Sequence, residues 1–183
     1  MTDRVRLEGR VVTLRPLMPI DIEPVLGSVM PWVTDRADSR DVRENLRGRI
    51  RTSGTMTVRE LLLGIEAGGR LVGDVQARRD VGPKGVFELG VSVFDGSRGR
   101  GYGREAIELL TAYVFERQGA HRVQLATDVA NAPMRAILER LRFGFEGVLR
   151  GFWPGSDGYH DYAMYAMTKD DFEETKREWI STD

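Results

Sequence analysis

A dense alternation of glycine and arginine, GSRGRGYGRE, occupies residues 96–105, after a segment typical of a β-strand and before one typical of a helix. The first N–H groups of a helix have no partner within it, and a Ser, Thr, Asp or Asn side chain usually caps them. Residues 99–103 contain no such side chain, so their N–H groups would point outward at the positive end of the helix dipole. Glycine lets an anion approach the backbone closely, and Arg98, Arg100 and Arg104 add positive charge. The segment therefore predicts a phosphate-binding site.

Two known phosphate-binding loops can be compared with this segment. A P-loop needs lysine and then serine or threonine after its second glycine, but Tyr102 and Gly103 stand at those positions. A dinucleotide-binding loop fits better, because Gly101, Gly103 and Ala106 match G-x-G-x-x-A and Asp128 ends the next expected strand. That loop usually opens its fold, however, whereas here it lies in mid-chain after segments that read as hairpins. A plain strand-to-helix turn remains the alternative that needs no ligand.

The elements that must position this loop are predicted from the spacing of apolar residues. Alternation predicts strands at 10–17, 60–66, 70–78, 86–94, 122–129, 145–153 and 162–168. Helical spacing predicts helices at 21–29, 38–52, 104–118 and 132–143, and a capping box starting at Thr168 predicts a terminal helix. Loops are expected at 31–38 and 154–160. The order is that of an α+β fold on a mixed sheet, with one parallel β-α-β crossover from 86–94 to 122–129.

Composition limits the function classes. A chain of 183 residues suits one domain, 1–183, and a net charge of −1 argues against a general nucleic-acid binder. The absence of cysteine excludes disulfides and thiolate metal sites and fits a reducing cytoplasm, and two distant histidines give no zinc pattern. No segment resembles a secretory signal or a membrane span, so no membrane partner is expected.

The loop and three further segments together resemble one family. Arg98-x-x-Gly101-x-Gly103 after a strand is similar to the Q/R-x-x-G-x-G/A signature of the GNAT N-acetyltransferase superfamily. The stretch NAPMRAILERLRFGFEGVLRG resembles its ribosomal-protein N-acetyltransferase-like branch, and GRVVTLRPLMPIDIEPVL and GYHDYAMYAMTKDDF look like the family's opening and closing segments. The resemblance implies a GNAT-like mixed, mostly antiparallel sheet with helices on both faces.

The resemblance also implies a co-substrate, acetyl-CoA. Its pyrophosphate would lie on the N–H groups of the loop, formed by Arg98, Gly99, Arg100, Gly101, Tyr102, Gly103 and Arg104. Its pantetheine arm would pair with the preceding strand at Val91, Ser92 and Val93, where that strand is expected to splay from 122–129. Asn131 matches a family asparagine that contacts the arm, but asparagine is also a favoured N-cap and a helix is expected to start at Ala132.

The implied reaction transfers an acetyl group to a primary amine, of a small molecule or a peptide N-terminus. An α-amino group with a pKa of about 8 is partly neutral at pH 7, whereas a lysine with a pKa of about 10.4 is almost fully charged, so a base would help. Glu88 is the candidate base, because it alternates with the apolar Phe87 and Leu89 and matches a glutamate of many relatives. An ordinary ion-paired strand residue is the alternative, and Asp95 is a weaker second candidate.

The sequence departs from the family where a proton donor for the leaving thiolate is expected. Met134 and Leu138 replace the usual serine and tyrosine, and neither can donate a proton. The tyrosines near the end of the chain are substitutes among which the sequence does not choose: Tyr159, Tyr162 and Tyr165. A GNAT-shaped module that binds acyl-CoA without turnover is therefore the alternative function. The resemblance also allows for a homodimer. Three aromatic residues beside expected loops are candidates to line an acceptor pocket, with packing in the core as the alternative: Trp32, Phe152 and Trp153.

Overall fold

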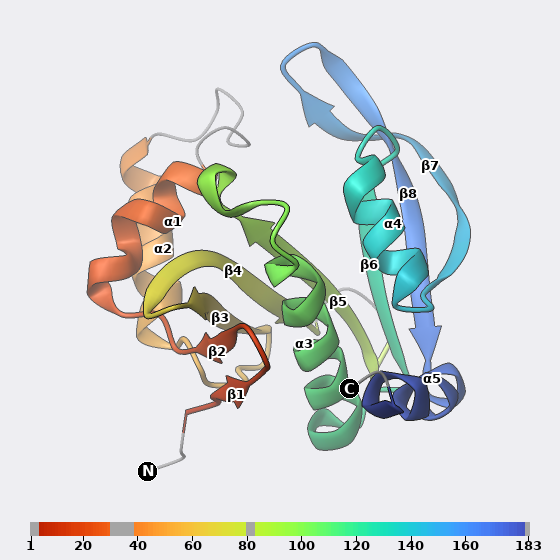
Figure 1. Cartoon of the computed structure of the whole chain (residues 1–183). Helices are drawn as coiled ribbons and strands as arrows, with labels where there is room; N and C mark the ends of the chain where they lie inside the picture. Colours follow the sequence, from red (N-terminus) through yellow and green to blue (C-terminus); the bar gives the residue numbers. More distant parts are fainter. Residues whose placement is uncertain (1–3, 30–38, 80–82, 182–183) are drawn as a thin grey trace. The chain divides into compact units, whose positions relative to one another are not determined.

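The computed structural model describes residues 4–29, 39–79 and 83–181 (Figure 1). The predicted loop 31–38, with Trp32, lies outside these residues. The described residues form two compact units, Met1–Arg78 with Gly90–Leu110 and Arg79–Leu89 with Thr111–Asp183. The strand order of the sheet is β1-β2-β3-β4-β5-β6-β8-β7. Strand β5 (Val86–Val93) and helix α3 (Tyr102–Gln118) each begin in one unit and end in the other.

The strands of the first unit form an antiparallel meander. They are β1 (Leu7–Glu8), β2 (Thr13–Arg15), β3 (Glu60–Ala67) and β4 (Arg70–Arg78). The prediction of one strand over 10–17 was wrong in its first half. The Gly9 N–H donates to the Val12 carbonyl at 2.8 Å, which turns the chain between β1 and β2. The carboxylate of Glu105 on α3 accepts hydrogen bonds from the N–H groups of this turn.

Two helices cover one face of these strands. After the short 3-10 turn η1 (Pro19–Asp21) come α1 (Ile22–Val29) and α2 (Ser39–Arg51), on one side in Figure 1. The apolar spacing that predicts the helix at 38–52 forms one buried stripe on α2, since Leu46 and Ile50 are buried and Val42 packs beside them. Their partners are Leu17, Val25, Leu26 and Leu62. Burying a leucine or isoleucine contributes about 1.5–3 kcal/mol, so this cluster accounts for the helices lying on the sheet.

Helix α3 follows β5 through the 3-10 turn η3 (Asp95–Ser97). Four residues of α3 are fully buried: Ala106, Ile107, Leu110 and Val114. Their spacing is that of one helix face, in agreement with the helix predicted at 104–118. The helix ends at Gly119, which has a φ of 65°, as the sequence predicts. The glycine-rich segment therefore leads into a helix that is anchored by buried residues from Ala106 onward.

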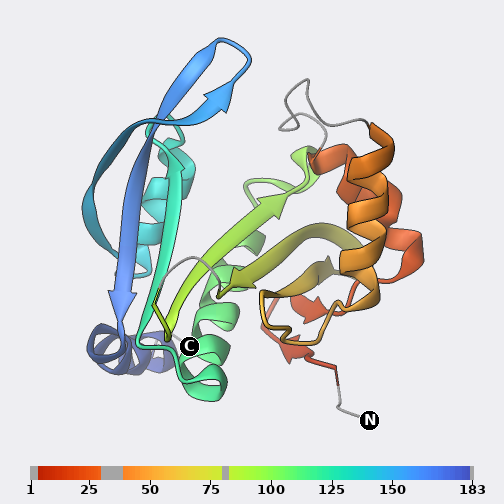
Figure 2. The same cartoon turned by 180° about the vertical axis from the view of Figure 1, so that it is seen from behind.

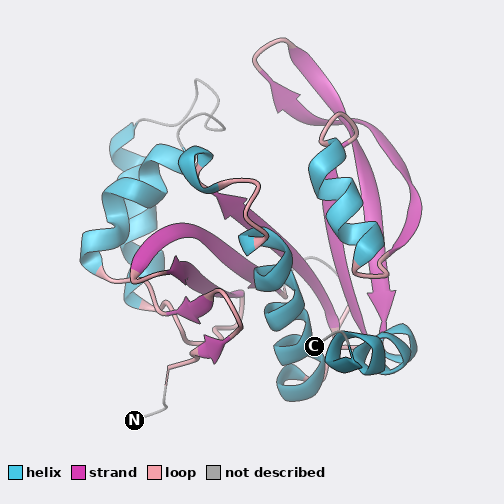
Figure 3. Ribbon diagram, viewed as in Figure 1, coloured by secondary structure: helices cyan, strands magenta, loops and turns pink. Residues whose placement is uncertain are grey.

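The second unit joins three strands to the start of β5. β6 (Arg122–Asp128) runs parallel to β5 in the register Val86↔Arg122 to Glu88↔Gln124, as predicted. Helix α4 (Ala132–Arg140) connects β6 to β7 (Gly144–Gly155), and β8 (Gly158–Thr168) lies between β6 and β7. Helix α5 (Lys169–Ser181) begins at the predicted capping box, since the Asp171 N–H donates to Thr168 Oγ1 and the Thr168 N–H donates to Asp171 Oδ2. Figures 2 and 3 show these strands with α4 along them.

The predicted loop 154–160 is wrong. Strands β7 and β8 extend almost to the tip of a long hairpin, where Pro154 pairs with Tyr159 and Gly155 with Gly158. Proline is compatible with this position because β7 is at the edge of the sheet, where its missing N–H removes no ladder bond. The signal for a tight hairpin was present in Ser156-Asp-Gly between two aromatic segments.

No helix of the described residues is long and apolar enough to cross a membrane.

Candidate active site

The glycine-rich segment forms an open turn ahead of α3. Gly99 has a φ of 75° and Gly101 a φ of 80°, in the left-handed region that favours glycine. An added Cβ at either position would meet nothing within 4 Å, so the backbone is accessible there. The Glu105 N–H donates to the Gly101 carbonyl at 3.1 Å, whereas the N–H groups of residues 99–104 have no acceptor among the described residues. These groups can receive an anion.

The three arginines of the segment differ in how firmly they are held. The Arg98 Nε donates to the Val93 carbonyl at 3.1 Å, and its guanidinium lies 2.9 Å from Asp95. Arg104 lies 3.9 Å from Glu108, and Arg100 is exposed. Arg98 thus ties the turn to β5, and Arg100 keeps the freedom to meet an anion. Asp95, the second candidate base, is an exposed partner of Arg98.

The backbone of β5 has its polar groups on two edges. The Phe94 N–H donates to the Val72 carbonyl of β4 at 2.9 Å. Because N–H and C=O groups of an antiparallel ladder alternate along a strand, those of Ser92 face β4 as well, and those of Val91 and Val93 face the other edge. Of the three residues predicted to pair with the pantetheine arm, Val91 and Val93 thus offer backbone groups at that edge, where the Val93 carbonyl already accepts from Arg98.

Glu88 lies in the first half of β5, within the second unit. It is half-buried between the buried Phe87 and Leu89, so its side chain leaves the opposite face of the strand, as predicted. The Gln124 Nε2 of β6 donates to Glu88 Oε2 at 3.4 Å.

Asn131 caps α4 in the second unit. Its Oδ1 accepts from the Met134 N–H at 3.3 Å and its Nδ2 donates to Thr127 Oγ1 at 3.2 Å. The alternative interpretation of Asn131 as an N-cap is confirmed, and a contact with the pantetheine arm stays a prediction. Leu138 is fully buried, and Met134 is half-buried.

The three candidate tyrosines fall into different environments. Tyr165 is fully buried, and its hydroxyl donates to Glu139 at 3.0 Å and accepts from Arg135 at 3.2 Å. Burial and the charge of Asp128 raise the pKa of Tyr162 above 10. Tyr159 is exposed. Tyr162 is protonated at neutral pH, as a proton donor must be, and its raised pKa makes it a weaker acid than an exposed tyrosine.

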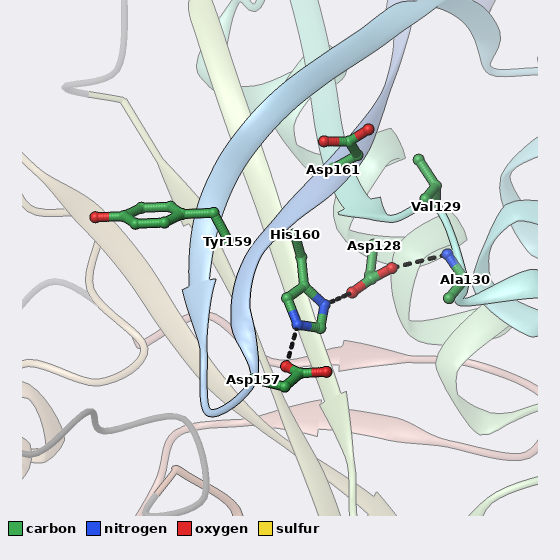
Figure 4. A pocket seen from close by; sticks show the side chains of 7 residues that line it. All are labelled: Asp128, Val129, Ala130, Asp157, Tyr159, His160 and Asp161. Atoms are coloured by element: carbon green, nitrogen blue, oxygen red, sulfur yellow. Dashed lines mark hydrogen bonds and ion pairs between the residues drawn. The ribbon is translucent and has the colours of Figure 1, made fainter.

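Sequence reasoning missed a histidine held between two carboxylates. His160 Nδ1 lies 2.7 Å from Asp128 Oδ2, and His160 Nε2 lies 2.7 Å from Asp157 Oδ1 (Figure 4). Asp128 also accepts from the Ala130 N–H at 2.7 Å. These groups, with Val129, Tyr159 and Asp161, line an open cavity of about 420 Å³. The sequence predicts a loop at 154–160, whereas β7 and β8 form a hairpin there. Only this hairpin brings Asp157 to His160, which explains why the cluster was missed.

This cluster makes stability depend on pH. Hydrogen bonds to Asp157 and Asp128 raise the pKa of His160 above 6.5. The bond from His160 lowers the pKa of Asp157, and the Ala130 N–H together with His160 lowers the pKa of Asp128. A raised histidine pKa adds stability that is complete below the unfolded pKa and is lost as the pH rises through the folded pKa. We expect His160→Gln to lower the melting temperature at about pH 6 and to lower it less at about pH 9. Thermal unfolding over this range tests the expectation; an effect that grows with pH would contradict it, and Asp157→Asn should show the same trend as His160→Gln.

Comparisons with known proteins find acetyltransferases. Residues 12–144 match the model of the acetyltransferase (GNAT) domain. The chain is 30% identical over 119 residues to "Putative ribosomal N-acetyltransferase YdaF" and 26% identical over 111 residues to "SPbeta prophage-derived uncharacterized N-acetyltransferase YokL", both of Bacillus subtilis. These matches cover 63% and 61% of this chain, and they span only 65% and 63% of the two relatives.

Solved structures share the whole fold. A "putative acetyltransferase" from T. thermophilus is 26% identical, with a TM-score of 0.75 over 99% of this chain and 98% of that one. RimL, a ribosomal L7/L12 α-N-protein acetyltransferase in complex with coenzyme A, has a TM-score of 0.75 over 91% of this chain and 99% of its own, at 16% identity, and shows the fold alone. The chain belongs to the GNAT acetyltransferase family, which confirms the predicted family and fold. This membership also supports the predicted class, an acyltransferase that uses acetyl-CoA.

Proposed function

We propose that the protein is an acetyl-CoA-dependent N-acetyltransferase that acetylates a primary amine in a ternary complex. The observation that carries the proposal is the open turn at residues 99–104, whose N–H groups have no acceptor among the described residues, in a chain of the GNAT family. Anions bind at such helix starts because the N–H groups and the helix dipole both favour negative charge. The pyrophosphate would lie on these groups, near Arg100 and Arg104.

Residues of β5 would hold the rest of the co-substrate. Val91 and Val93 offer backbone groups at the edge of β5 that faces away from β4, and these match the amides of the pantetheine arm. The Arg98 side chain, bound to the Val93 carbonyl, would fix the turn relative to this strand. Asn131 would contribute its side-chain amide while it caps α4.

Glu88 would act as the general base. It would take one proton from the acceptor's ammonium, directly or through a water molecule. The neutral nitrogen then attacks the thioester carbonyl carbon, so that the C–N bond forms and the C–S bond breaks. The nitrogen loses its second proton to the departing thiolate, through water or through Tyr162. The products are the amide, the free thiol and a protonated Glu88.

The acceptor would be a small amine or a peptide N-terminus. An α-amino group needs less help from a base than a lysine, because its pKa of about 8 lies closer to neutrality. The similarity to "Putative ribosomal N-acetyltransferase YdaF" favours a protein acceptor. A cytoplasmic location, which fits the cysteine-free sequence, and a homodimer belong to the same proposal.

Release of free thiol tests this function. The protein is incubated with acetyl-CoA and a panel of small amines and N-terminal peptides, and its melting temperature is measured with coenzyme A and with NADH. We expect stabilisation by coenzyme A and amine-dependent thiol release. Stabilisation without turnover would favour a non-catalytic acyl-CoA-binding module, and stabilisation by NADH alone would contradict both functions.

Glu88→Gln should lower the acetylation rate about 10²-fold or more, which is typical for the loss of a general base. It should also steepen the dependence of the rate on pH, because only amine that is already neutral in solution can then react. The affinity for coenzyme A should persist. Steady-state rates over a range of pH measure both effects, and an unchanged rate would remove Glu88 from the mechanism. Glu146→Gln, an exposed strand residue paired with Arg122, is the control.

A further inference from the structure

Polar side chains interrupt the apolar layer of the sheet in the first unit. Gln76 of β4 pairs with Leu62, a member of the apolar cluster under α1 and α2. Asp74 lies two residues earlier and shares this face. Ser92 of β5 also faces these helices. We call Asp74, Gln76 and Ser92 the polar patch. Polar groups in such a layer lower stability unless hydrogen bonds compensate them, so the patch needs an explanation.

The register of the two strands brings Asp74 next to Ser92. The N–H of Phe94, directly after β5, donates to the Val72 carbonyl of β4 at 2.9 Å. The two strands run antiparallel (Figure 2). Two residues further into each strand, Asp74 and Ser92 lie directly opposite each other. Side chains at such positions have Cβ atoms about 4.5–5.5 Å apart. Whatever Asp74 binds therefore also lies beside Ser92.

The neighbours of Asp74 already have partners. Ser92 Oγ lies 2.5 Å from Ser28 Oγ of α1. Arg49 of α2 donates to Glu60 of β3 at 2.7 and 2.9 Å and also to Gln76 Oε1. Gly90 leaves room for Gln76, because a Cβ there would lie 2.9 Å from its Nε2. Farther along β4, Arg78 shares this face.

Asp74 differs from these neighbours. Its Oδ1 is buried and takes no hydrogen bond from any described residue. Burial raises the pKa of Asp74 to about 6, although the charge of Arg49 acts in the opposite direction. A raised carboxyl pKa means that the folded state is favoured while the group is protonated and loses that stability as the pH rises through about 6. At neutral pH the ionised Asp74 therefore works against folding, as functional groups often do.

We propose that Asp74 binds the ammonium group of the acceptor and so positions the amine. This inference rests on the proposed function. The buried Oδ1 offers an acceptor that a cation would satisfy, and a bond between charged groups is stronger than a neutral one. Ser92 lies opposite Asp74 and also stands between Val91 and Val93, the residues proposed to hold the pantetheine arm. The proposed acceptor site and the proposed co-substrate site are therefore adjacent at Ser92. The ammonium and the thioester would thus meet at one segment of β5.

Asp74 would bind the amine in its charged form, before the amine loses a proton. No bond is made or broken at Asp74 itself. Its protonation below about pH 6 would abolish the ion pair, so kcat/KM for the amine should fall there while the affinity for coenzyme A does not.

Asp74→Asn keeps the shape of the side chain and removes its charge. We expect KM for the amine to rise at least about tenfold, with a smaller change in kcat and none in KM for acetyl-CoA. The fall of kcat/KM below about pH 6 should disappear. The melting temperature at pH 7 should stay equal or rise. Asp41→Asn, which removes an exposed carboxylate of α2, should change none of these.

The outcomes separate the two proposals. A wild-type protein that uses the amine panel, with an Asp74→Asn variant of unchanged KM and pH profile, would overturn the role of Asp74 and leave the proposed function intact. An unchanged KM with a lower melting temperature would show a structural carboxylate and would also overturn it. A wild-type protein that releases no thiol with any amine would overturn the proposed function, and the acceptor role of Asp74 with it.

Discussion

Replacing Gly101 with valine is expected to raise KM for acetyl-CoA by about ten- to a hundredfold. Hydrogen bonds to a charged group contribute about 1.5–3 kcal/mol each, and about 1.4 kcal/mol corresponds to a tenfold change in affinity. Gly101 has a φ of 80°, which a β-branched residue adopts only with strain. The strain would turn the N–H groups of residues 99–104 away from the pyrophosphate. The valine side chain would also occupy the open space beside Gly101, where the pyrophosphate is proposed to bind.

A second glycine provides the matched control. Gly68 lies in the tight turn between β3 and β4 with a φ of 56°, and a Cβ there would also meet nothing within 4 Å. Gly68→Val therefore introduces a similar strain of about 1–3 kcal/mol, but away from the proposed pyrophosphate site. Calorimetric titration with coenzyme A, together with thermal unfolding, compares the two variants. If both lose the same stability and both keep their affinity, the turn at residues 99–104 does not bind the co-substrate.

The elements of this fold could be predicted because their apolar residues repeat with clear periods. Leu46 and Ile50 mark the buried side of α2, and the parallel crossover from β5 to β6 follows from a strand, a helix and a strand in succession. The two mistakes concern strand ends. Near Gly9 a short turn is fixed by a partner distant in sequence, and Pro154 sits in an edge strand that accepts proline. No local pattern shows the distant partner of the first turn. For the second, the hairpin signal Ser156-Asp-Gly is local, but only the place of β7 at the edge of the sheet shows that proline fits there.

Those residues of the candidate site that belong to a local motif could be predicted from the sequence. The glycine-rich segment and Glu88 could be singled out because each follows a pattern along the chain. Asp74 could not, because its significance lies in a buried oxygen without a partner, which depends on the strands and helices around it. His160 lies between two carboxylates that only the folded chain brings together. Tertiary burial and pairing decide the chemistry of these two residues, and a sequence pattern does not contain them.

Glu105 shows how strongly such a tertiary contact can act. Its side chain lies in the first turn of α3, yet it accepts hydrogen bonds from the backbone N–H groups of Arg10, Val11 and Val12 at 2.8, 2.9 and 2.7 Å. Burial alone would raise the pKa of Glu105, but these N–H groups hold it below 4.5. Gly9 is required beside it, since a Cβ there would lie 2.8 Å from the carboxyl carbon. One carboxylate thus fixes the turn between β1 and β2 against α3.

Glu105→Ala is therefore expected to be strongly destabilising, by about 3 kcal/mol or more. The Val12 N–H is buried, and leaving it unsatisfied costs about 1–3 kcal/mol. The partly buried N–H groups of Arg10 and Val11 lose bonds to a charged acceptor, each of about 1.5–3 kcal/mol, which water replaces only in part. For a chain of this size the melting temperature should fall by about 6–12 °C, since each kcal/mol corresponds to about 2–4 °C. Glu116→Ala, which removes an exposed partner of Lys176 from the same helix, should cost about 1 kcal/mol or less.

The dependence on pH separates this explanation from a general loss of packing. A lowered carboxyl pKa adds stability that is present above the unfolded pKa of about 4.5 and is lost as the pH falls through the folded pKa. The difference in melting temperature between the wild type and Glu105→Ala should therefore shrink as the pH falls below 4.5, because the wild type then loses the same interaction. A difference that stays constant over that range would mean that the glutamate stabilises the turn through its aliphatic carbons and that its charge contributes little.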